Sequence, residues 1–311
     1  MKPPGIVVVG SSNTDMILRL PRIPRPGETL LGGEYLTAAG GKGANQAVAA
    51  ARAGGQVTFV ARVGTDSLGD QAVAGFCRER INVDFLRRDP KCPSGVALIF
   101  VSAAGENSIG VAPGANGRLA VADVRRARQA IAEADVLLVQ LEVPLPVVLA
   151  AVAMAHAAGT PVILNPAPAQ KLPADLLRRV DVLTPNESEA SLLTGVKVKD
   201  VAGAGRAARK LRAQGVGTVI VTLGAKGALL VTGEGEVLVP SFPVEPLDTT
   251  AAGDVFNGAL AVALGRGHSL VESVRFACAA AALSVTRLGA QPSAPRRGAI
   301  QRLLGQSRKQ A

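Results

Sequence analysis

The sequence predicts an α/β fold with a mostly parallel central sheet covered by helices on both faces. Short apolar segments rich in β-branched residues alternate with segments of helical periodicity, and 48% of the 311 residues are hydrophobic. A chain of this length can form one large domain or two smaller ones, and we predict one domain over residues 1–311. Ligands should then bind beyond the carboxyl ends of the strands.

The individual elements follow from local patterns. Residues 6–9 are an apolar run that ends at Gly10, which is typical of a buried parallel strand. Residues 255–264 carry apolar side chains at helical spacing, and Ser269 with Glu272 forms a capping box that begins a further helix. The other elements that we expect are two strands between 16 and 37 that include 16–20 and 29–31, a helix at about 44–53, a strand at 57–63, a strand at 92–101 with a turn at 105–108, a helix at 123–133, strands at 136–139, 162–164, 182–184 and 218–221, and a helix from 269 to about 287.

Composition limits the ligands that the protein can bind. The chain has 34 Lys and Arg against 24 Asp and Glu, a net charge of +10, which suits an anionic ligand such as a nucleotide and would also suit nucleic acid. It has one Tyr and no Trp for stacking on bases, and its arginines are spread along the predicted helices. We therefore interpret the charge as a solvated basic surface and expect no nucleic-acid partner.

The cysteines and the apolar stretches indicate a cytosolic protein without a membrane anchor. Cys77, Cys92 and Cys278 have no metal-binding spacing, and their odd number argues against a disulfide framework. The amino terminus shows no signal peptide. Residues 146–164 are almost wholly apolar, but Gly159 and its neighbours divide them into a helix, a turn and a strand.

Residues 248–260 form the most informative stretch of the chain. The turn 250–253 opens a buried helix, and helix openings bind anions through free backbone N–H groups. The small side chains of Ala251, Ala252 and Gly253 would let a bulky anion approach that backbone. Asp254, in the first helical turn, is either a helix cap or a general base beside the anion.

A glycine-rich turn at residues 40–46 precedes another helix. Its glycines bring backbone close to a ligand, and Lys42 and Asn45 add hydrogen-bond donors. The turn is not a P-loop, because Gly43 rather than Ser or Thr follows Lys42. Spacing alone makes it weak evidence for a site.

Polar residues also follow several predicted strands. Asn13 and Asp15 could bind neighbouring hydroxyl groups, and Glu142 follows the strand 136–139. Asn186 and Glu189 open a helix and could face a phosphate and a water-bound Mg²⁺. Taken singly, these residues are better explained as loop residues or helix caps.

The pattern G-x-G-x-x-A at residues 203–208 imitates a dinucleotide-binding motif, but its context does not fit one. No apolar strand precedes it, and it lies at the start of a predicted exposed helix. A dinucleotide site there is therefore improbable.

Several motifs together resemble the ribokinase family of carbohydrate kinases, over residues 10–295. They are D-T-T-A-A-G-D at 248–254, G-G-K-G-A-N-Q at 40–46, G-T-D-S-L-G at 64–69, N-E-S-E at 186–189 and T-L-G-A-K-G at 222–227. The resemblance implies a three-layer α/β/α domain with a small β-sheet lid inserted at about 14–40 and 92–110. It also implies ATP as co-substrate, Mg²⁺, K⁺ and a homodimer formed through the lid.

The resemblance further implies a set of site residues. The sugar would contact Asn13, Asp15, Gly41, Lys42, Gly43, Asn45, Glu142 and Asp254. Catalysis would use Asp254 as base, with the anion turn Ala251, Ala252 and Gly253. The nucleotide would contact Asn186, Thr222, Gly224, Lys226, Gly227, Gly253 and Cys278, although relatives often have His or Asn where Cys278 stands. A monovalent cation would lie near Asp248, Thr250, Ser284, Arg287, Gly289 and Ser293, and Mg²⁺ near Glu189 through water.

The resulting hypothesis is transfer of the terminal phosphoryl group of ATP to the 5-hydroxyl of D-ribose. Within the family, deoxyribose, fructose or a nucleoside are alternative acceptors. A sugar sensor without catalysis and a nucleic-acid-binding protein are alternatives from other classes. A hydrolase triad finds no support, since His156 and His268 are the only histidines and no G-x-S-x-G occurs.

Overall fold

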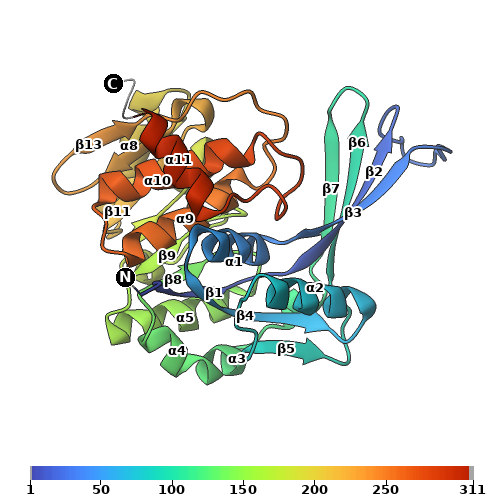
Figure 1. Ribbon diagram of the computed structural model, residues 1–311, viewed down its shortest axis with the longest axis horizontal. Helices are drawn as coiled ribbons and strands as arrows, with labels where there is room; N and C mark the ends of the chain where they lie inside the picture. The colour runs from blue at the N-terminus through green and yellow to red at the C-terminus, as the bar shows by residue number, and fades with distance from the viewer. Residues whose placement is uncertain (1, 308–311) are drawn as a thin grey trace.

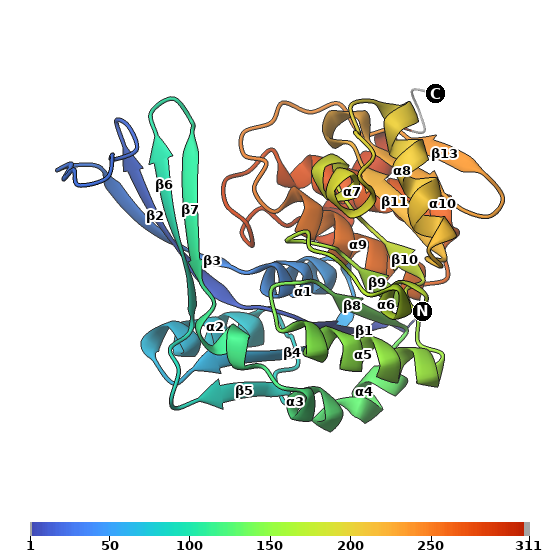
Figure 2. The same ribbon diagram turned by 180° about the vertical axis from the view of Figure 1, so that it is seen from behind.

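The computed structural model describes residues 2–307 as a large sheet between two layers of helices, with a small sheet standing at one end. Figures 1 and 2 show the small sheet projecting away from the helical body. This arrangement confirms the predicted α/β fold with a mostly parallel central sheet and a β-sheet lid.

The large sheet has nine strands, and their order is β13-β12-β11-β10-β9-β8-β1-β4-β5. All neighbours pair in parallel except β11 with β12 and β12 with β13. The strands are β1 (Gly5–Val9), β4 (Gln56–Gly64), β5 (Leu86–Asp89), β8 (Val136–Val139), β9 (Val162–Leu164), β10 (Val182–Leu183), β11 (Thr218–Thr222), β12 (Ala228–Val231) and β13 (Glu236–Val239).

The helices lie between these strands in the chain. They are α1 (Lys42–Ala53), α2 (Ser67–Arg78), α3 (Val121–Arg126), α4 (Arg128–Ala132), α5 (Leu145–Ala158), α6 (Ala174–Leu177), α7 (Glu187–Thr194), α8 (Val201–Ala213), α9 (Ala252–Gly265), α10 (Leu270–Ser284) and α11 (Arg297–Ser307), with the 3-10 turns η1 (Gly114–Arg118) and η2 (Gly224–Lys226).

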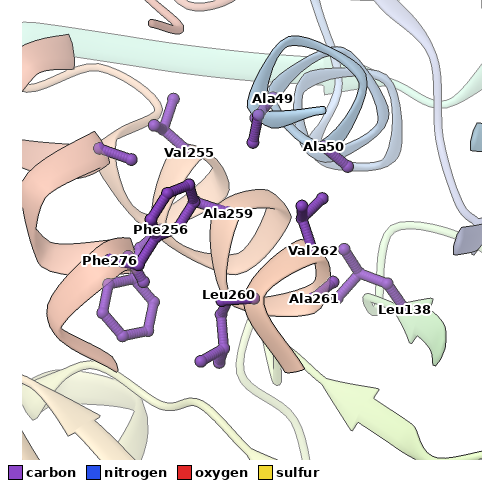
Figure 3. Close-up of a cluster of buried hydrophobic side chains, with 14 of the residues drawn as sticks. Ala49, Ala50, Leu138, Val255, Phe256, Ala259, Leu260, Ala261, Val262 and Phe276 are labelled. Carbon is purple, nitrogen blue, oxygen red and sulfur yellow. The ribbon is translucent and has the colours of Figure 1, made fainter. Parts of the chain in front are cut away.

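Strand β1 shows why the core has two halves. Successive side chains of a strand point to opposite faces. Ile6 and Val8 therefore join one apolar cluster with α1, α9 and α10, whereas Val7 and Val9 join another with α5 and α8. Figure 3 shows part of the first cluster, where Phe256 and Leu260 of α9 lie near Phe276 of α10.

The lid is a four-stranded sheet in the order β3-β2-β6-β7. Its strands are β2 (Asn13–Leu20), β3 (Glu34–Gly40), β6 (Gly95–Ser102) and β7 (Asn107–Ala112). Only three residues separate β1 from β2, so the lid grows directly from an inner strand of the large sheet. Asn13, at the start of β2, pairs with Gly40 of β3 and Gly95 of β6.

Several predicted boundaries were wrong. Residues 29–31 lie in a loop, because the second lid strand begins only at Glu34. The strand expected at 92–101 runs from Gly95 to Ser102, and residues 107 and 108, predicted as turn, belong to β7.

Two helix predictions also differ from the structure. The helix predicted at 123–133 is broken at Ala127, whose φ of −89° and ψ of 8° leave the helical region, into α3 and α4. The helix predicted to reach about 287 ends at Ser284.

The G-x-G-x-x-A segment forms helix α8, which is capped by Asp200. Its prediction as exposed was wrong for one face, since Ala204, Ala207 and Ala208 are fully buried. The small residues thus let the helix pack closely on the sheet. The apolar stretch 146–164 became α5 and β9 as predicted, and among the described residues no helix is both long and apolar enough to cross a membrane.

Helices α1 and α9 approach each other closely at Gly258. A Cβ atom there would lie 2.6 Å from the Gln46 carbonyl oxygen and 2.8 Å from the Ala50 nitrogen. Because backbone cannot move aside as a flexible side chain can, we expect Gly258→Ala to destabilise the protein by about 1–3 kcal/mol despite the better helix propensity of alanine. Urea unfolding measures this change.

Gly305 in α11 provides the matched control. It is exposed, and no atom lies within 4 Å of its missing Cβ. Gly305→Ala should be neutral or stabilise by up to about 1 kcal/mol. Equal effects of the two substitutions would contradict the close packing of α1 on α9.

Candidate active site

A cavity of about 350 Å³ lies between the carboxyl ends of the strands and the lid. Its walls come from the start of β2, the openings of α1, α7 and α9, and the inner face of β6 and β7. The sequence-predicted residues that line it are Asn13, Asp15, Gly41, Lys42, Asn45, Glu142, Asn186, Glu189, Thr222, Thr250, Ala251, Ala252, Gly253 and Asp254. Segments that are far apart in the chain therefore meet in one cavity, because all of them lie at the same edge of the sheet.

The glycine-rich turn is pressed against the junction of β1 and β2. Gly41 caps α1 with a φ of 87°, and a Cβ there would lie 2.6 Å from the Asn13 nitrogen. Gly43 is buried, and its N–H donates to Ser11 Oγ. This close approach places Lys42 beside Asn13 at the cavity wall.

Asn13 and Asp15 lie on β2 rather than in a loop. Asn116 of η1 donates from Nδ2 to Asn13 Oδ1 at 2.7 Å, so the Nδ2 group of Asn13 is the part left for a ligand. Burial, followed by the nearby carboxylates of Glu142 and Asp254, raises the pKa of Asp15 to about 6. Sequence reasoning missed Asn116, because nothing in its local sequence links it to Asn13.

Glu142 follows β8 and joins the two turns. Its Oε2 accepts hydrogen bonds from the Lys42 N–H at 2.9 Å and from the Ser11 hydroxyl. The carboxylate therefore holds the start of α1 against the end of β1.

The opening of α9 has the features of an anion site. Ala251 has a φ of 57°, a left-handed conformation that is uncommon for a residue with a side chain. Gly253 lines the cavity, and no atom lies within 4 Å of its missing Cβ. This leaves the free N–H groups of a 14-residue helix open to a bulky ligand.

Asp254 lies at the bottom of the cavity with 6% of its surface exposed. Its Oδ2 accepts from Asn45 Nδ2 at 3.0 Å, and its Oδ1 accepts from Gln46 Nε2 at 2.9 Å. Burial raises its pKa above the usual range, although Lys42 and the two amide donors act in the opposite direction. Such a carboxylate can accept a proton from a bound hydroxyl.

Lys42 is the cation among these acids. Burial lowers its pKa, but the carboxylates of Asp254 and Glu142, together with Glu189, outweigh burial and raise it. The ammonium group therefore stays charged and offsets the negative charge of the cavity.

Asn186 and Glu189 form a reciprocal helix cap. Asn186 Oδ1 accepts from the Glu189 N–H at 2.8 Å, and Glu189 Oε2 accepts from the Asn186 N–H at 2.9 Å. Burial raises the pKa of Glu189. Across the described part of the chain, no group of three or more acidic, His or Cys side chains could hold a metal by itself. A divalent cation at Glu189 would need oxygen atoms from a ligand or water, which suits Mg²⁺.

The remaining predicted nucleotide residues lie outside the cavity wall, except for Thr222. Gly224 and Lys226 are exposed in the turn η2 after β11, and Gly227 is buried beside β13. Cys278 is 4% exposed within the apolar core, and burial raises the pKa of its thiol to about 12. Its contact with adenine stays a prediction.

The predicted monovalent-cation residues come from two adjacent segments. Asp248 accepts from the Thr250 N–H at 2.9 Å and from the Gly289 N–H at 2.8 Å. Burial raises the pKa of Asp248, but these hydrogen bonds outweigh it and leave the pKa below its usual range. Ser284 and Ser293 are buried and donate to backbone carbonyls, whereas Arg287 is exposed.

A second cavity of about 600 Å³ adjoins the first and is lined by Asp248, Thr250 and Gly289. Arg52 of α1 holds the loop that follows Gly289. Its Nη1 donates to the carbonyl oxygens of Gln291, Pro292 and Ala294, while Glu79 pairs with the rest of the guanidinium. These hydrogen bonds hold the loop against α1, and the monovalent-cation site stays a prediction.

Sequence reasoning also missed buried polar residues in the wall of the cavity. Asn165, Thr184 and Asn257 line its lower wall, and the Thr184 hydroxyl donates to Asn257 Oδ1 at 2.6 Å. The strand-end positions of Asn165 and Thr184 were the available signal, since both lie at the end of a predicted strand.

Comparison with known proteins identifies the family. Residues 4–297 match the model of the pfkB family of carbohydrate kinases. The chain belongs to this family. The pfkB match extends over nearly all of the described residues, and the cavity places the open start of a helix beside several polar side chains.

Individual members of the pfkB family are similar over almost their full length. Ribokinase of Haemophilus influenzae is 46% identical over 94% of this chain and 95% of its own. A deoxyribokinase of Salmonella typhi is 38% identical over 93% of this chain and 95% of its own. The structure of Arabidopsis thaliana ribokinase complexed with ribose and ATP superposes with a TM-score of 0.90 at 35% identity, covering 97% of this chain and 99% of that one.

The raised pKa of Asp15 predicts a pH-dependent effect of Asp15→Asn. The folded protein disfavours the ionised carboxylate and is destabilised when Asp15 ionises. This destabilisation is absent below pH 3.8, the pKa of Asp15 in the unfolded chain, and develops as the pH rises from there through about 6. At pH 8 we expect Asp15→Asn to be more stable than the unsubstituted protein by about 1–3 kcal/mol, and the gain should vanish towards pH 4. Thermal unfolding across this range, without sugar, measures the difference. Asp84→Asn in an exposed turn serves as control, and a gain independent of pH would show that ionisation of Asp15 is not its cause.

Proposed function

We propose that the protein transfers the terminal phosphoryl group of ATP to the 5-hydroxyl of D-ribose, giving D-ribose 5-phosphate and ADP. The observation that carries this proposal is the buried carboxylate of Asp254 directly beside the open helix terminus at Gly253. The similarity to ribokinases supports ribose as the acceptor.

Asn13 and Asp15 bind the sugar hydroxyls, with Lys42 and Glu142 completing the polar wall. Asp254 accepts the proton of the 5-hydroxyl as its oxygen attacks the terminal phosphorus of ATP. A bond forms between that oxygen and phosphorus, and the bond from phosphorus to the ADP oxygen breaks. The N–H groups at the start of α9 stabilise charge on the transferring group.

The nucleotide lies along the opening of α9 towards Asn186 and Thr222, with Gly224, Lys226 and Gly227 beyond them. Mg²⁺, when bound, neutralises phosphate charge, and Glu189 would hold it through water, because its Oε1 is not used in the helix cap. K⁺ would be held by oxygen atoms of the loops around Asp248 and residues 284–293.

Two further proposals concern the protein in the cell. The free thiols of the three cysteines suit a reducing cytosol. The outer face of the lid carries Tyr35 and Leu98, which are 60% and 50% exposed, and this apolar face supports a homodimer through the lid.

The substrate proposal is tested by measuring ADP formation with D-ribose, 2-deoxyribose, fructose and adenosine, each with Mg²⁺ and either K⁺ or Na⁺. We expect turnover to depend on ribose and to be higher in K⁺. The deoxyribokinase relative makes 2-deoxyribose the second candidate. Faster turnover with another acceptor would keep the kinase chemistry and replace ribose as the substrate.

The role of Asp254 predicts a separation of binding from catalysis. We expect Asp254→Asn to lower kcat about 10²- to 10⁴-fold, because the amide cannot accept the proton, while ribose binding by calorimetry is retained. Asp175→Asn on the exposed helix α6 is the control and should leave kcat unchanged. Near-normal turnover of purified Asp254→Asn would disprove the base.

A further inference from the structure

Buried amide side chains form a chain that ends on Asp254 from behind the cavity. Gln46 of α1 is 0% exposed, and its Nε2 donates to Asp254 Oδ1 at 2.9 Å and to Asn165 Oδ1 at 3.0 Å. Gln140, which follows β8 and is also 0% exposed, donates from Nε2 to Gln46 Oε1 at 2.5 Å. Three segments that are distant in sequence thus meet at the Gln46 amide, and Gln46 makes the contact with Asp254 Oδ1.

The orientation of each amide in this chain is determined by its neighbours. An ionised carboxylate only accepts hydrogen bonds, so Gln46 must turn its NH₂ group to Asp254 and its oxygen to Gln140. Asn165 donates from Nδ2 to the Thr184 carbonyl at 3.2 Å, which leaves its oxygen for Gln46. Rotating any one amide by half a turn would bring two donors or two acceptors together.

The two oxygens of Asp254 have different surroundings. Oδ1 is held by Gln46, which does not line the cavity, whereas Oδ2 accepts from Asn45, which does. A substrate hydroxyl that enters the cavity can therefore approach Oδ2 while Oδ1 stays fixed.

We propose that Gln46 is a positioning residue that holds Asp254 so that Oδ2 faces the sugar hydroxyl, and that Gln140 keeps the Gln46 amide turned towards Asp254. The proposal rests on the role of Asp254 as base in the proposed function. Gln140 Oε1 has no hydrogen-bond partner among the described residues. A buried acceptor without a partner lowers the stability of the fold. We therefore attribute Gln140 to the orientation of the Gln46 amide rather than to folding.

A charge-swap experiment tests the contact between Gln46 and Asp254 without reference to turnover. Gln46→Glu sets two carboxyl groups against each other and should lower the melting temperature at pH 8. Adding Asp254→Asn restores one donor and one acceptor with their places exchanged, so the double variant should regain part of the lost stability. Lys42 and Glu142, the other charges that act on Asp254, are unchanged in both variants.

Gln129 provides a matched control on the surface. Its Nε2 donates to Glu133 Oε1 at 2.8 Å, and both residues are exposed. Gln129→Glu makes the same change of an amide into an acid beside a carboxylate, and water should screen it. The proposal would be overturned if Gln46→Glu lowered the melting temperature no more than Gln129→Glu does. It would also be overturned if adding Asp254→Asn to Gln46→Glu lowered the melting temperature further.

Gln140→Met tests positioning in the active enzyme, since methionine keeps the length of the side chain but cannot donate to Gln46. We expect kcat to fall about 3- to 10-fold while KM for ribose stays unchanged. Unchanged kcat, or a change confined to KM, would count against the proposal. This variant also decides the matter if Gln46→Glu does not fold.

The two proposals can fail separately. If the unsubstituted protein turned over none of the tested sugars, the proposed function would fail, while the stability of the charge-swap pair would still test the contact. If ribose turnover is present but Gln140→Met behaves as the unsubstituted protein, only the positioning role is rejected.

Discussion

The contact of α1 with α9 is the constraint on which the site depends. Gly258 permits the two helices to touch through their backbones, and this brings Asn45 and Gln46 at the start of α1 to Asp254 at the start of α9. Each helix opening faces the carboxyl ends of the strands. The donor amides and the acceptor carboxylate are therefore fixed by helix packing, before any ligand binds.

The sequence predicted those parts of the site whose signal is local. The turns at 40–46 and 248–254 contain their own glycines, donors and acid, so their residue types suggested a nearby ligand at the first turn and an anion at the second without knowledge of the fold. The resemblance to a family then placed the lid. The nine-stranded order was not predictable in the same way, because strand pairing depends on contacts between distant segments.

Asn116, Gln140 and Asn165 were missed because they act through partners that lie 94 to 119 positions away, and a lone amide in a sequence gives no sign of such a partner. The break at Ala127 and the loop at 29–31 were missed for a related reason, since apolar spacing alone does not reveal where neighbouring elements force the chain to turn.

Negative charge is concentrated in the cavity even though the chain carries a net charge of +10. Asp15, Glu142, Glu189 and Asp254 surround one lysine, and burial raises the pKa of three of these acids. The positive field that attracts a nucleotide thus comes from the surface and from the opening of α9, and in the proposed function the acids bind hydroxyl groups and cations.

Strand β2 begins at Asn13, the root of the lid where it joins the large sheet. A rotation at this root would therefore displace the far end of β2 more than its near end. Asp15 lies two residues from this root and Leu20 seven, which correspond to about 7 Å and about 23 Å along an extended strand. A rotation of about 10° at the root would move the tip by about 4 Å but Asp15 by only about 1 Å. Any rotation of the lid about this root would therefore displace the tip of β2 far more than the cavity wall at Asp15.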